Sequence, residues 1–357
     1  VPDSVSQTAQ HARFFRLSTR YGDDLEGDAA SMGHGAQRSV QIALINALAQ
    51  IRRGGLGVMD RTILLLVDEP ELYLHPQAIA VVKTALKQLS QNGFQVAFTT
   101  HTGELIGSDD ASKTLIIRRN ADDGCRCLPT MEEVAAIIGD AGQQADTLFE
   151  LSNSKEFLFS DRVVLVEGRT ETVIFPHIYH AVNRRSLAES RVGLIKLDGS
   201  GSLKKAGDVL RAMGLEVKII ADLDYVFRTA RQNGMLGVTD ERFYEIRSIC
   251  SRLADKGCFV LADDGFPKKS KICSAEQGFA RLAQDADASA IIDTFVEDLQ
   301  EMHIWIWSRG SIEDHIGIEG KSLTAQRQFV QNLQQSNDLS FLPEAASISE
   351  AVAFIDR

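Results

Sequence analysis

The strongest constraint on the fold is a short apolar run that ends in two acids, residues 163–171 of sequence VVLVEGRTE. Four aliphatic residues in succession predict a strand buried on both faces, as in a parallel sheet covered by helices. Gly168 ends this strand, and the apolar spacing that follows predicts a helix from Thr170. We therefore expect Glu167 at the carboxyl end of the strand and Glu171 in the first helical turn, both facing the crevice where open α/β sheets bind ligands.

A second acidic pair follows another apolar run. Residues 217–221 (VKIIA) predict a buried strand, and Asp222 and Asp224 come directly after it at positions i and i+2, which a strand points to the same side. Carboxylates held close together repel one another, and a divalent cation is the usual way to offset that repulsion. The sequence therefore predicts four acidic metal ligands at one sheet edge. The alternative is that these are solvated acids at strand ends.

These motifs resemble the Toprim domain, the metal-binding catalytic fold shared by topoisomerases, bacterial primases and several nucleases. Glu167 matches the glutamate of that family, and Asp222 and Asp224 match its D-x-D motif. Glu171 is typical of the OLD (overcoming lysogenisation defect) nucleases, in which a Toprim domain follows an ABC-class ATPase domain. The resemblance implies an α/β fold with a Rossmann-like parallel sheet and two divalent cations, Mg²⁺ or Mn²⁺, with Ca²⁺ as a non-productive substitute.

A further element follows the last expected strand, residues 302–307. The sequence R-G-S-I-E at 309–313 resembles the R-G-x-[LI]-E element of OLD-type nucleases, which implies that Glu313 is a metal ligand, with Ser311 as an additional candidate. OLD-type nucleases also have a lysine downstream of this element, and the first one here is Lys321. We expect its ammonium to act in catalysis with Glu167 and Asp222, although a solvated lysine is the other interpretation. Three other lysines are candidates for the same role: Lys268, Lys269 and Lys271.

The first part of the chain resembles the C-terminal half of an ABC ATPase domain, over roughly residues 30 to 120. The expected strand at 61–67 ends in Asp68 and Glu69, which match a Walker B element; its aspartate holds Mg²⁺ and its glutamate orients the attacking water. His101 resembles the switch histidine that contacts the terminal phosphate. Three residues before a predicted helix resemble the signature sequence, whose free backbone N–H groups suit an anion: Gly33, Gly35 and Gln37.

The lysine-bearing phosphate loop of such ATPases, G-x-x-x-x-G-K-[ST], does not occur in the sequence. The chain also starts at Val1 without an initiator methionine. We therefore expect a C-terminal fragment of a longer protein, which in its complete form would bind ATP and Mg²⁺ and could form a homodimer through the ATPase domain.

Length and composition fit two globular domains. With 357 residues and 44% apolar content, the chain can bury ordinary cores. We place the partial ATPase domain at residues 1–120, a helical connector at 121–160 and the Toprim domain at 161–357, with a helical insertion at about 226–300. Because no apolar run reaches the length of a membrane span, we expect a cytoplasmic protein without a membrane partner.

The charge balance bears on the substrate. Lys and Arg number 38 against 49 Asp and Glu, a formal net charge of −11, which argues against a protein that coats nucleic acid. Acids grouped at a metal site do not repel a polyanion once cations are bound. Basic residues are locally dense at 184–185, 204–205 and 268–271, although each group is also consistent with a solvated surface.

The motifs together predict a divalent-metal-dependent DNA nuclease of the OLD type, acting as an endonuclease or nickase and also as a candidate exonuclease, controlled by an ATPase domain. The resemblance implies a role in phage interference or DNA processing. One alternative is a Toprim enzyme that acts on RNA or in primer synthesis. Another is a non-catalytic, ATP-gated DNA-binding protein, for which concentrated acids would bring no advantage.

Overall fold

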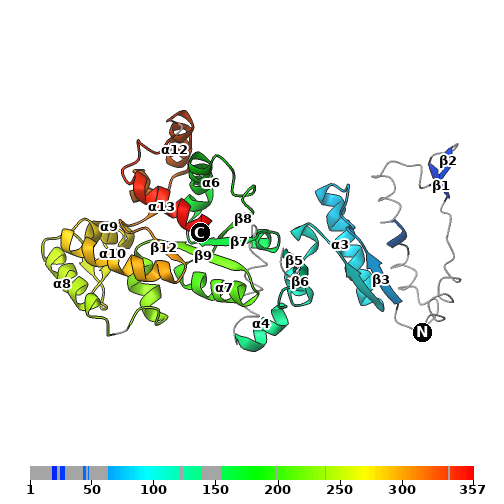
Figure 1. The fold of residues 1–357 in the computed structure, drawn as a ribbon, viewed down its shortest axis with the longest axis horizontal. Helices are drawn as coiled ribbons and strands as arrows, with labels where there is room; N and C mark the ends of the chain where they lie inside the picture. The colour runs from blue at the N-terminus through cyan, green and yellow to red at the C-terminus, as the bar shows by residue number, and fades with distance from the viewer. Residues whose placement is uncertain are drawn as a thin grey trace. The chain divides into compact units, whose positions relative to one another are not determined.

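The structure is a computed structural model that divides into two compact units, Val1–Ile106 and Gly107–Arg357, each described separately below (Figure 1). It describes residues 18–21, 25–28, 43–45, 47, 63–120, 124–138, 154–197, 199–237, 239–336 and 338–357. Three residues expected at the nucleotide site lie outside this set: Gly33, Gly35 and Gln37.

The first unit contains a strand–helix–strand element. Strands β3 (Ile63–Val67) and β4 (Phe94–Phe98) pair in parallel, and α3 (Pro76–Gln91) connects them. The buried face of α3 packs against the strands, which confirms the expected strand that ends at the Walker B acids. A separate antiparallel pair consists of β1 (Ser18–Tyr21) and β2 (Leu25–Asp28).

The second unit is built around a four-stranded parallel sheet. Its strands are β7 (Arg162–Val166), β8 (Val192–Lys196), β9 (Glu216–Ala221) and β12 (Ile304–Ile306), in the order β12-β9-β7-β8. Helix α6 (Arg169–Asn183) connects β7 to β8, and α7 (Ser200–Ala212) connects β8 to β9. The chain continues from β7 to β8 on one side and from β9 to β12 on the other, so the switch in strand order lies between the carboxyl ends of β7 and β9, where such sheets bind ligands.

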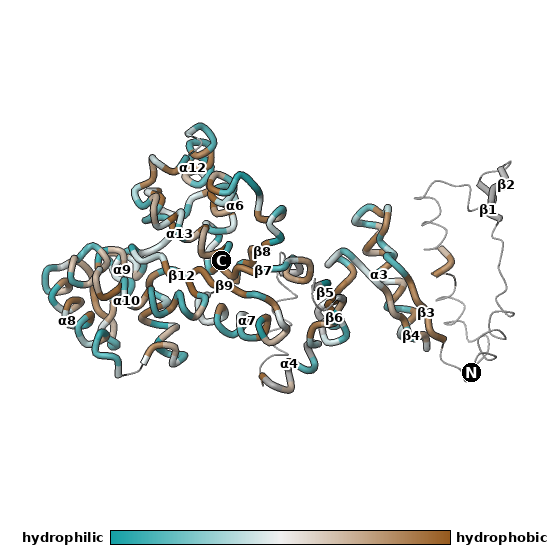
Figure 2. The backbone as a smooth tube through the Cα atoms, viewed as in Figure 1, coloured by the Kyte–Doolittle hydropathy of each residue, from teal (hydrophilic) through white to brown (hydrophobic). Residues whose placement is uncertain are grey.

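Helices cover both faces of this sheet, which explains why its strands are continuously apolar. On one face, Gly207 of α7 lies so close to β7 and β9 that a Cβ there would be 3.7 Å from Leu165 and 3.3 Å from Ile219. On the other face, Val164 and Val166 join one buried cluster with α6, α11 (Ile312–Ile316), α12 (Leu323–Ser336) and α13 (Ala345–Asp356). Figure 2 shows the apolar strands enclosed between these helices.

Two basic side chains fix the C-terminal helix to the sheet. The Lys218 ammonium, only 3% exposed, donates to the carbonyl of Phe354 at 2.6 Å and to that of Ile355 at 3.3 Å. Arg162 also donates to the Ile355 carbonyl, at 2.6 Å. The last turn of α13 thus finds cationic donors for its free carbonyls.

The segment before the sheet differs from the expected helical connector. Strands β5 (Ile117–Asn120) and β6 (Gly124–Cys127) form an antiparallel hairpin, which is followed by α4 (Met131–Ile137). Arg118 of this hairpin donates to the Ser160 carbonyl at 2.6 Å, just before β7. The hairpin therefore belongs to the same compact unit as the sheet, and the unit begins at Gly107.

The region between β9 and β12 is mainly helical, as expected. It begins with a π-helical turn, η5 (Val226–Ala230), and continues with α8 (Glu241–Asp255), a small pair formed by β10 (Val260–Leu261) and β11 (Pro267–Lys268), α9 (Ala275–Ala283) and α10 (Ala286–Glu301). Phe227 lies at the centre of its core, where its ring centroid is 5.1 to 6.3 Å from four other rings: Phe243, Phe266, Phe279 and Phe295. Across the described residues, no helix is both long and apolar enough to cross a bilayer.

This core gives a stability prediction. We expect Phe227→Ala to lower the free energy of unfolding by about 3–5 kcal/mol, the usual cost of a large cavity in an aromatic core. Tyr244→Ala is the matched control because Tyr244 is 61% exposed on the same insertion, and it should change stability by less than about 1 kcal/mol. Urea unfolding followed by circular dichroism measures both. Equal losses in the two variants would contradict the packing described above.

Candidate metal centre

The E-G-x-x-E motif places two glutamates at the carboxyl end of the central strand. Glu167 directly follows β7, and its Oε2 is buried without a hydrogen-bond partner. Gly168 precedes α6 and lets Glu171 fold back, because a Cβ at position 168 would collide with the Glu171 carboxylate. Glu171 is only 2% exposed. The glycine of the motif is therefore required by the second glutamate as well as by the end of the strand.

The D-x-D motif lies at the end of the neighbouring strand. Asp222 directly follows β9, and its Oδ1 is buried without a hydrogen-bond partner. Leu223 donates its backbone N–H to the Gly310 carbonyl at 2.7 Å, which ties the motif to the segment that carries Glu313. Because β7 and β9 are adjacent and parallel, both acidic motifs meet at one sheet edge, as the sequence predicts.

Glu313 reaches this edge from α11 and is held by a hydrogen-bond chain. Gln326 donates to the Thr170 hydroxyl at 3.0 Å, and Thr170 donates to Oε1 of Glu313 at 2.5 Å. All three side chains are buried. The Ser311 hydroxyl instead donates to Asp314 at 2.9 Å within α11, and its role as a metal ligand stays a prediction.

Lys321 lies among these acids, and its catalytic role stays a prediction. Its ammonium is 3.8 Å from Oδ2 of Asp222 and 3.0 Å from Oε1 of Glu276. Partial burial works against the charged form, but the Asp222, Glu313 and Glu276 carboxylates outweigh it and raise the pKa of Lys321. Lys321 therefore stays protonated across the physiological range.

The carboxylates are held where ionisation is unfavourable. Burial raises the pKa of Glu167, with repulsion from Asp224 adding to the rise. Burial and, to a smaller extent, the Glu313 carboxylate raise the pKa of Glu171 to about 7. Burial followed by repulsion from Glu171 raises the pKa of Asp222 well above its usual value, and burial also raises that of Asp224 despite the nearby Arg228.

The donor set fits a divalent cation. Oxygen ligands from carboxylates are what Mg²⁺ and Ca²⁺ prefer, and the buried oxygens of Glu167 and Asp222 lack any protein partner. Within the described ranges, however, no three acidic, histidine or cysteine side chains are yet grouped tightly enough to hold one ion. In this arrangement the Lys321 ammonium lies 3.8 Å from Oδ2 of Asp222, so a positive charge already stands beside one of these carboxylates.

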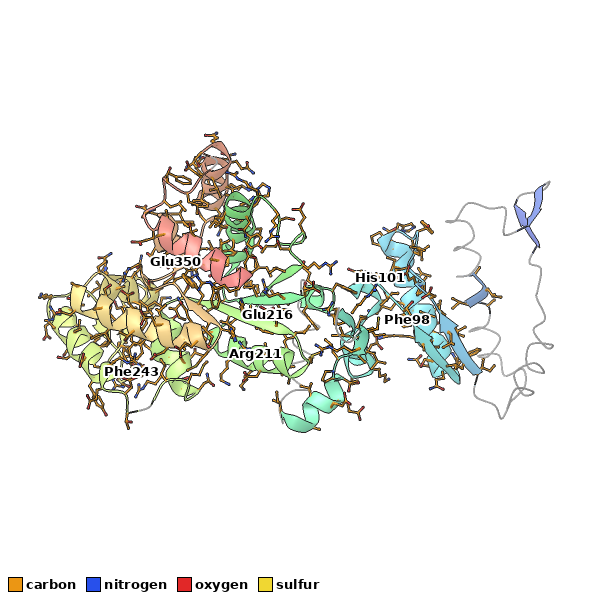
Figure 3. All side chains as sticks on the ribbon, in the orientation of Figure 1. Phe98, His101, Arg211, Glu216, Phe243 and Glu350 are labelled. Carbon is orange, nitrogen blue, oxygen red and sulfur yellow. The ribbon has the colours of Figure 1, made fainter. Side chains whose placement is uncertain are left out.

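The first unit groups the expected nucleotide residues that the structure describes. His101 follows β4, close to Phe98 (Figure 3). Its Nε2 lies 2.9 Å from Oε1 of Glu69, and the Thr99 hydroxyl donates to Asp68 at 2.5 Å. Glu71 also contributes, since its Oε1 accepts from the Thr100 hydroxyl at 2.6 Å and from the His101 backbone at 2.7 Å. The Walker B acids and the histidine thus belong to one hydrogen-bonded group.

Two residues of the candidate metal centre, Glu276 and Gln326, are not predicted by any motif in the sequence. Glu276 lies in the first turn of α9, far along the chain from the other acids, and only the Ser274–Gln277 capping box marks that helix start in the sequence. Gln326 belongs to the buried face of the amphipathic helix α12, and no motif around it marks this polar residue as part of a site.

Comparison with known proteins supports the same division. Residues 158–224 match the family described as overcoming lysogenization defect protein-like, TOPRIM domain, and residues 3–106 match the AAA ATPase domain. The chain therefore combines an ATPase domain with a Toprim domain. ATPase domains generally use ATP with Mg²⁺, and Toprim domains generally use divalent metal ions. More particularly, its Toprim domain is of the OLD-like type, which confirms the resemblance drawn from the motifs.

Three relatives illustrate this similarity. The Old nuclease of Escherichia phage P2 is 30% identical over 312 residues, which cover 86% of this chain and 52% of the phage protein. The OLD nuclease of Thermus scotoductus is 23% identical over 58% of this chain and 38% of its own length. Endonuclease GajA of Bacillus cereus is 27% identical over 42% of this chain and 24% of its own length. The chain thus spans about half the length of the phage relative, and less of the other two.

The raised pKa of Glu171 gives a testable pH dependence. Since this pKa is about 7 in the folded protein and near 4.5 in the unfolded chain, the metal-free protein should lose stability as pH rises through that window. Glu171→Gln removes the penalty, so we expect it to raise the melting temperature at pH 8 and to have little effect near pH 4.5. Melting with EDTA at both pH values measures this. A stabilisation that does not depend on pH would show that ionisation of Glu171 is not its cause.

Proposed function

We propose that this protein hydrolyses phosphodiester bonds in DNA with divalent cations bound at the acidic edge of its Toprim domain. The observation that carries the proposal is the pair of buried, unpartnered oxygens on Glu167 and Asp222, at the ends of adjacent parallel strands with a lysine ammonium beside them. The relatives support it, since two of them are named OLD nucleases and one an endonuclease.

The expected metal ligands come from two strand ends and from the helices next to them. Glu167 and Asp222 would hold the cations from the strand ends, with Asp224, Glu171 and Glu313 completing the acidic set. Bound cations would activate water and stabilise the departing oxygen. The protein keeps Glu313 oriented through Thr170 and Gln326, so this ligand need not be ordered when a cation binds.

Lys321 would act on the phosphate itself. The transition state of phosphodiester hydrolysis carries more negative charge than the substrate, and a fixed ammonium stabilises it more than it stabilises the ground state. Glu276 accepts from this ammonium at 3.0 Å, so it positions the charge. In the same proposal, the ATPase domain controls cleavage in the complete protein and supports a homodimer.

Cleavage assays with matched variants test the proposed function. We expect nicking or cutting of DNA with Mg²⁺ or Mn²⁺, without ATP, and none with EDTA. Glu167→Ala and Asp222→Ala should each reduce the rate by several orders of magnitude because they remove a ligand. Glu189→Ala is the control, since Glu189 is exposed and caps a turn through Ser186. Equal losses in all three variants, or cleavage of RNA alone, would contradict the proposal.

A second experiment isolates the ammonium. Lys321→Ala should reduce single-turnover cleavage by about a hundredfold or more, the scale of one preorganised charge. Cation affinity should not fall, because the variant removes a positive charge from beside the carboxylates. Calorimetric titration with Mn²⁺ beside the cleavage assay separates the two effects. Weaker cation binding in the variant would make the role of Lys321 indirect.

A further inference from the structure

Three lysines lie at the end of β11 and on the loop that joins it to α9. Lys268, Lys269 and Lys271 are exposed, and Ile272 next to them is 50% exposed. The loop leads within a few residues to Glu276, which contacts Lys321. A positively charged segment thus lies next in sequence to Glu276, at the border of the acidic centre. The acidic centre is the group of carboxylates beside Lys321: Glu167, Glu171, Asp222, Asp224 and Glu313.

The loop is tied to that centre at both ends. At its start, the Arg228 guanidinium donates to the Pro267 carbonyl at 3.1 Å, and the charge of Arg228 acts on Asp224. At its end, Glu276 holds the Lys321 ammonium. The loop is also compact, because a Cβ on Gly278 of α9 would lie only 2.6 Å from Cβ of Pro267. The lysines therefore have a fixed base at the rim of the site.

The positive charges of these three lysines are also available to a ligand. Several arginines of the insertion bind carboxylates or carbonyls of the insertion itself: Arg242, Arg247, Arg252 and Arg281. By contrast, Lys268, Lys269 and Lys271 form no ion pair with any carboxylate in the described part of the chain. In a chain of net charge −11, a polyanion needs such a local positive surface to approach.

We propose that Lys268, Lys269 and Lys271 form a phosphate-binding rim that holds the backbone of double-stranded DNA beside the acidic centre. This inference rests on the proposed nuclease function and adds the surface that receives the substrate. Lysine ammonium groups bind phosphates without reading the sequence. A duplex fits better than a single strand, because single-strand sites use exposed aromatic rings for stacking, whereas Phe266 and Phe279, the aromatic residues nearest to the loop in sequence, are buried.

The test compares a triple variant with a charge-matched control. The variant K268A/K269A/K271A removes the rim, and K113A/R119A/K256A removes the same charge from exposed positions on other elements. Binding of a fluorescein-labelled DNA duplex is followed by anisotropy over a series of salt concentrations, with Ca²⁺ in place of Mg²⁺ and intact DNA verified. We expect the rim variant to lose more than about tenfold in affinity at low salt and to reduce the salt slope by about 2.7, the value for three lost phosphate contacts.

Further arms decide the outcome. The charge-preserving variant K268R/K269R/K271R should keep the slope, and cleavage in Mg²⁺ should require more DNA for the rim variant but reach the same limiting rate. An unchanged slope, an equal loss in the control, or tighter lysine-dependent binding of single-stranded DNA would overturn the inference. Lysine-dependent duplex binding without any cleavage would leave the rim standing and refute the nuclease function. Cleavage without lysine-dependent binding would refute the rim and leave the nuclease function standing.

Discussion

The acidic centre depends on holding several carboxylates together where water cannot screen them. Two unit charges 4 Å apart interact by about 4 kcal/mol at an effective dielectric constant near 20. Loss of hydration on burial is a separate cost, and it is the main cause of the raised pKa of Glu167, Glu171 and Asp222. One ammonium, that of Lys321, offsets part of this cost. The rest must come from the surrounding fold, which is why a sheet buried on both faces lies beneath the acids.

Close backbone approaches make this crowding possible. At Gly168, any side chain would collide with the Glu171 carboxylate. At Gly310, with φ of 132°, a Cβ would meet the carboxylate of Asp314, while the Gly310 carbonyl accepts from Leu223 inside the D-x-D motif. Both glycines therefore leave room for a carboxylate, and at Gly310 the positive φ and the Cβ of Ala280, 2.9 Å from the position of a Cβ, exclude a side chain as well. The motifs E-G-x-x-E and R-G-x-I-E are alike in this physical sense.

Much of the Toprim half was predictable because its signals are local. Strands β7 and β9 are apolar runs that end in acids, and their parallel pairing brings Glu167 and Asp222 to one edge. Glu276 was not predictable, because it joins the site through packing of α9, and no periodic pattern reports such a contact. Strand β6 was also missed, since it carries an arginine between two exposed cysteines in place of alternating apolar residues.

The insertion is therefore part of the centre and not an appendage. Its aromatic core begins at Phe227, three residues after Asp224, so the chain passes from a candidate ligand directly into the packing of that core. Phe279, stacked on Phe227, lies one helical turn after Glu276 in α9. Each ring of the stacked pair thus lies three residues after a charged group of the site, Asp224 in one case and Glu276, which holds Lys321, in the other. Because protein interiors are closely packed, a change of volume in this core displaces both charges together. The packing of the aromatic core therefore bears on the geometry of the centre through the two short segments that join Phe227 to Asp224 and Phe279 to Glu276.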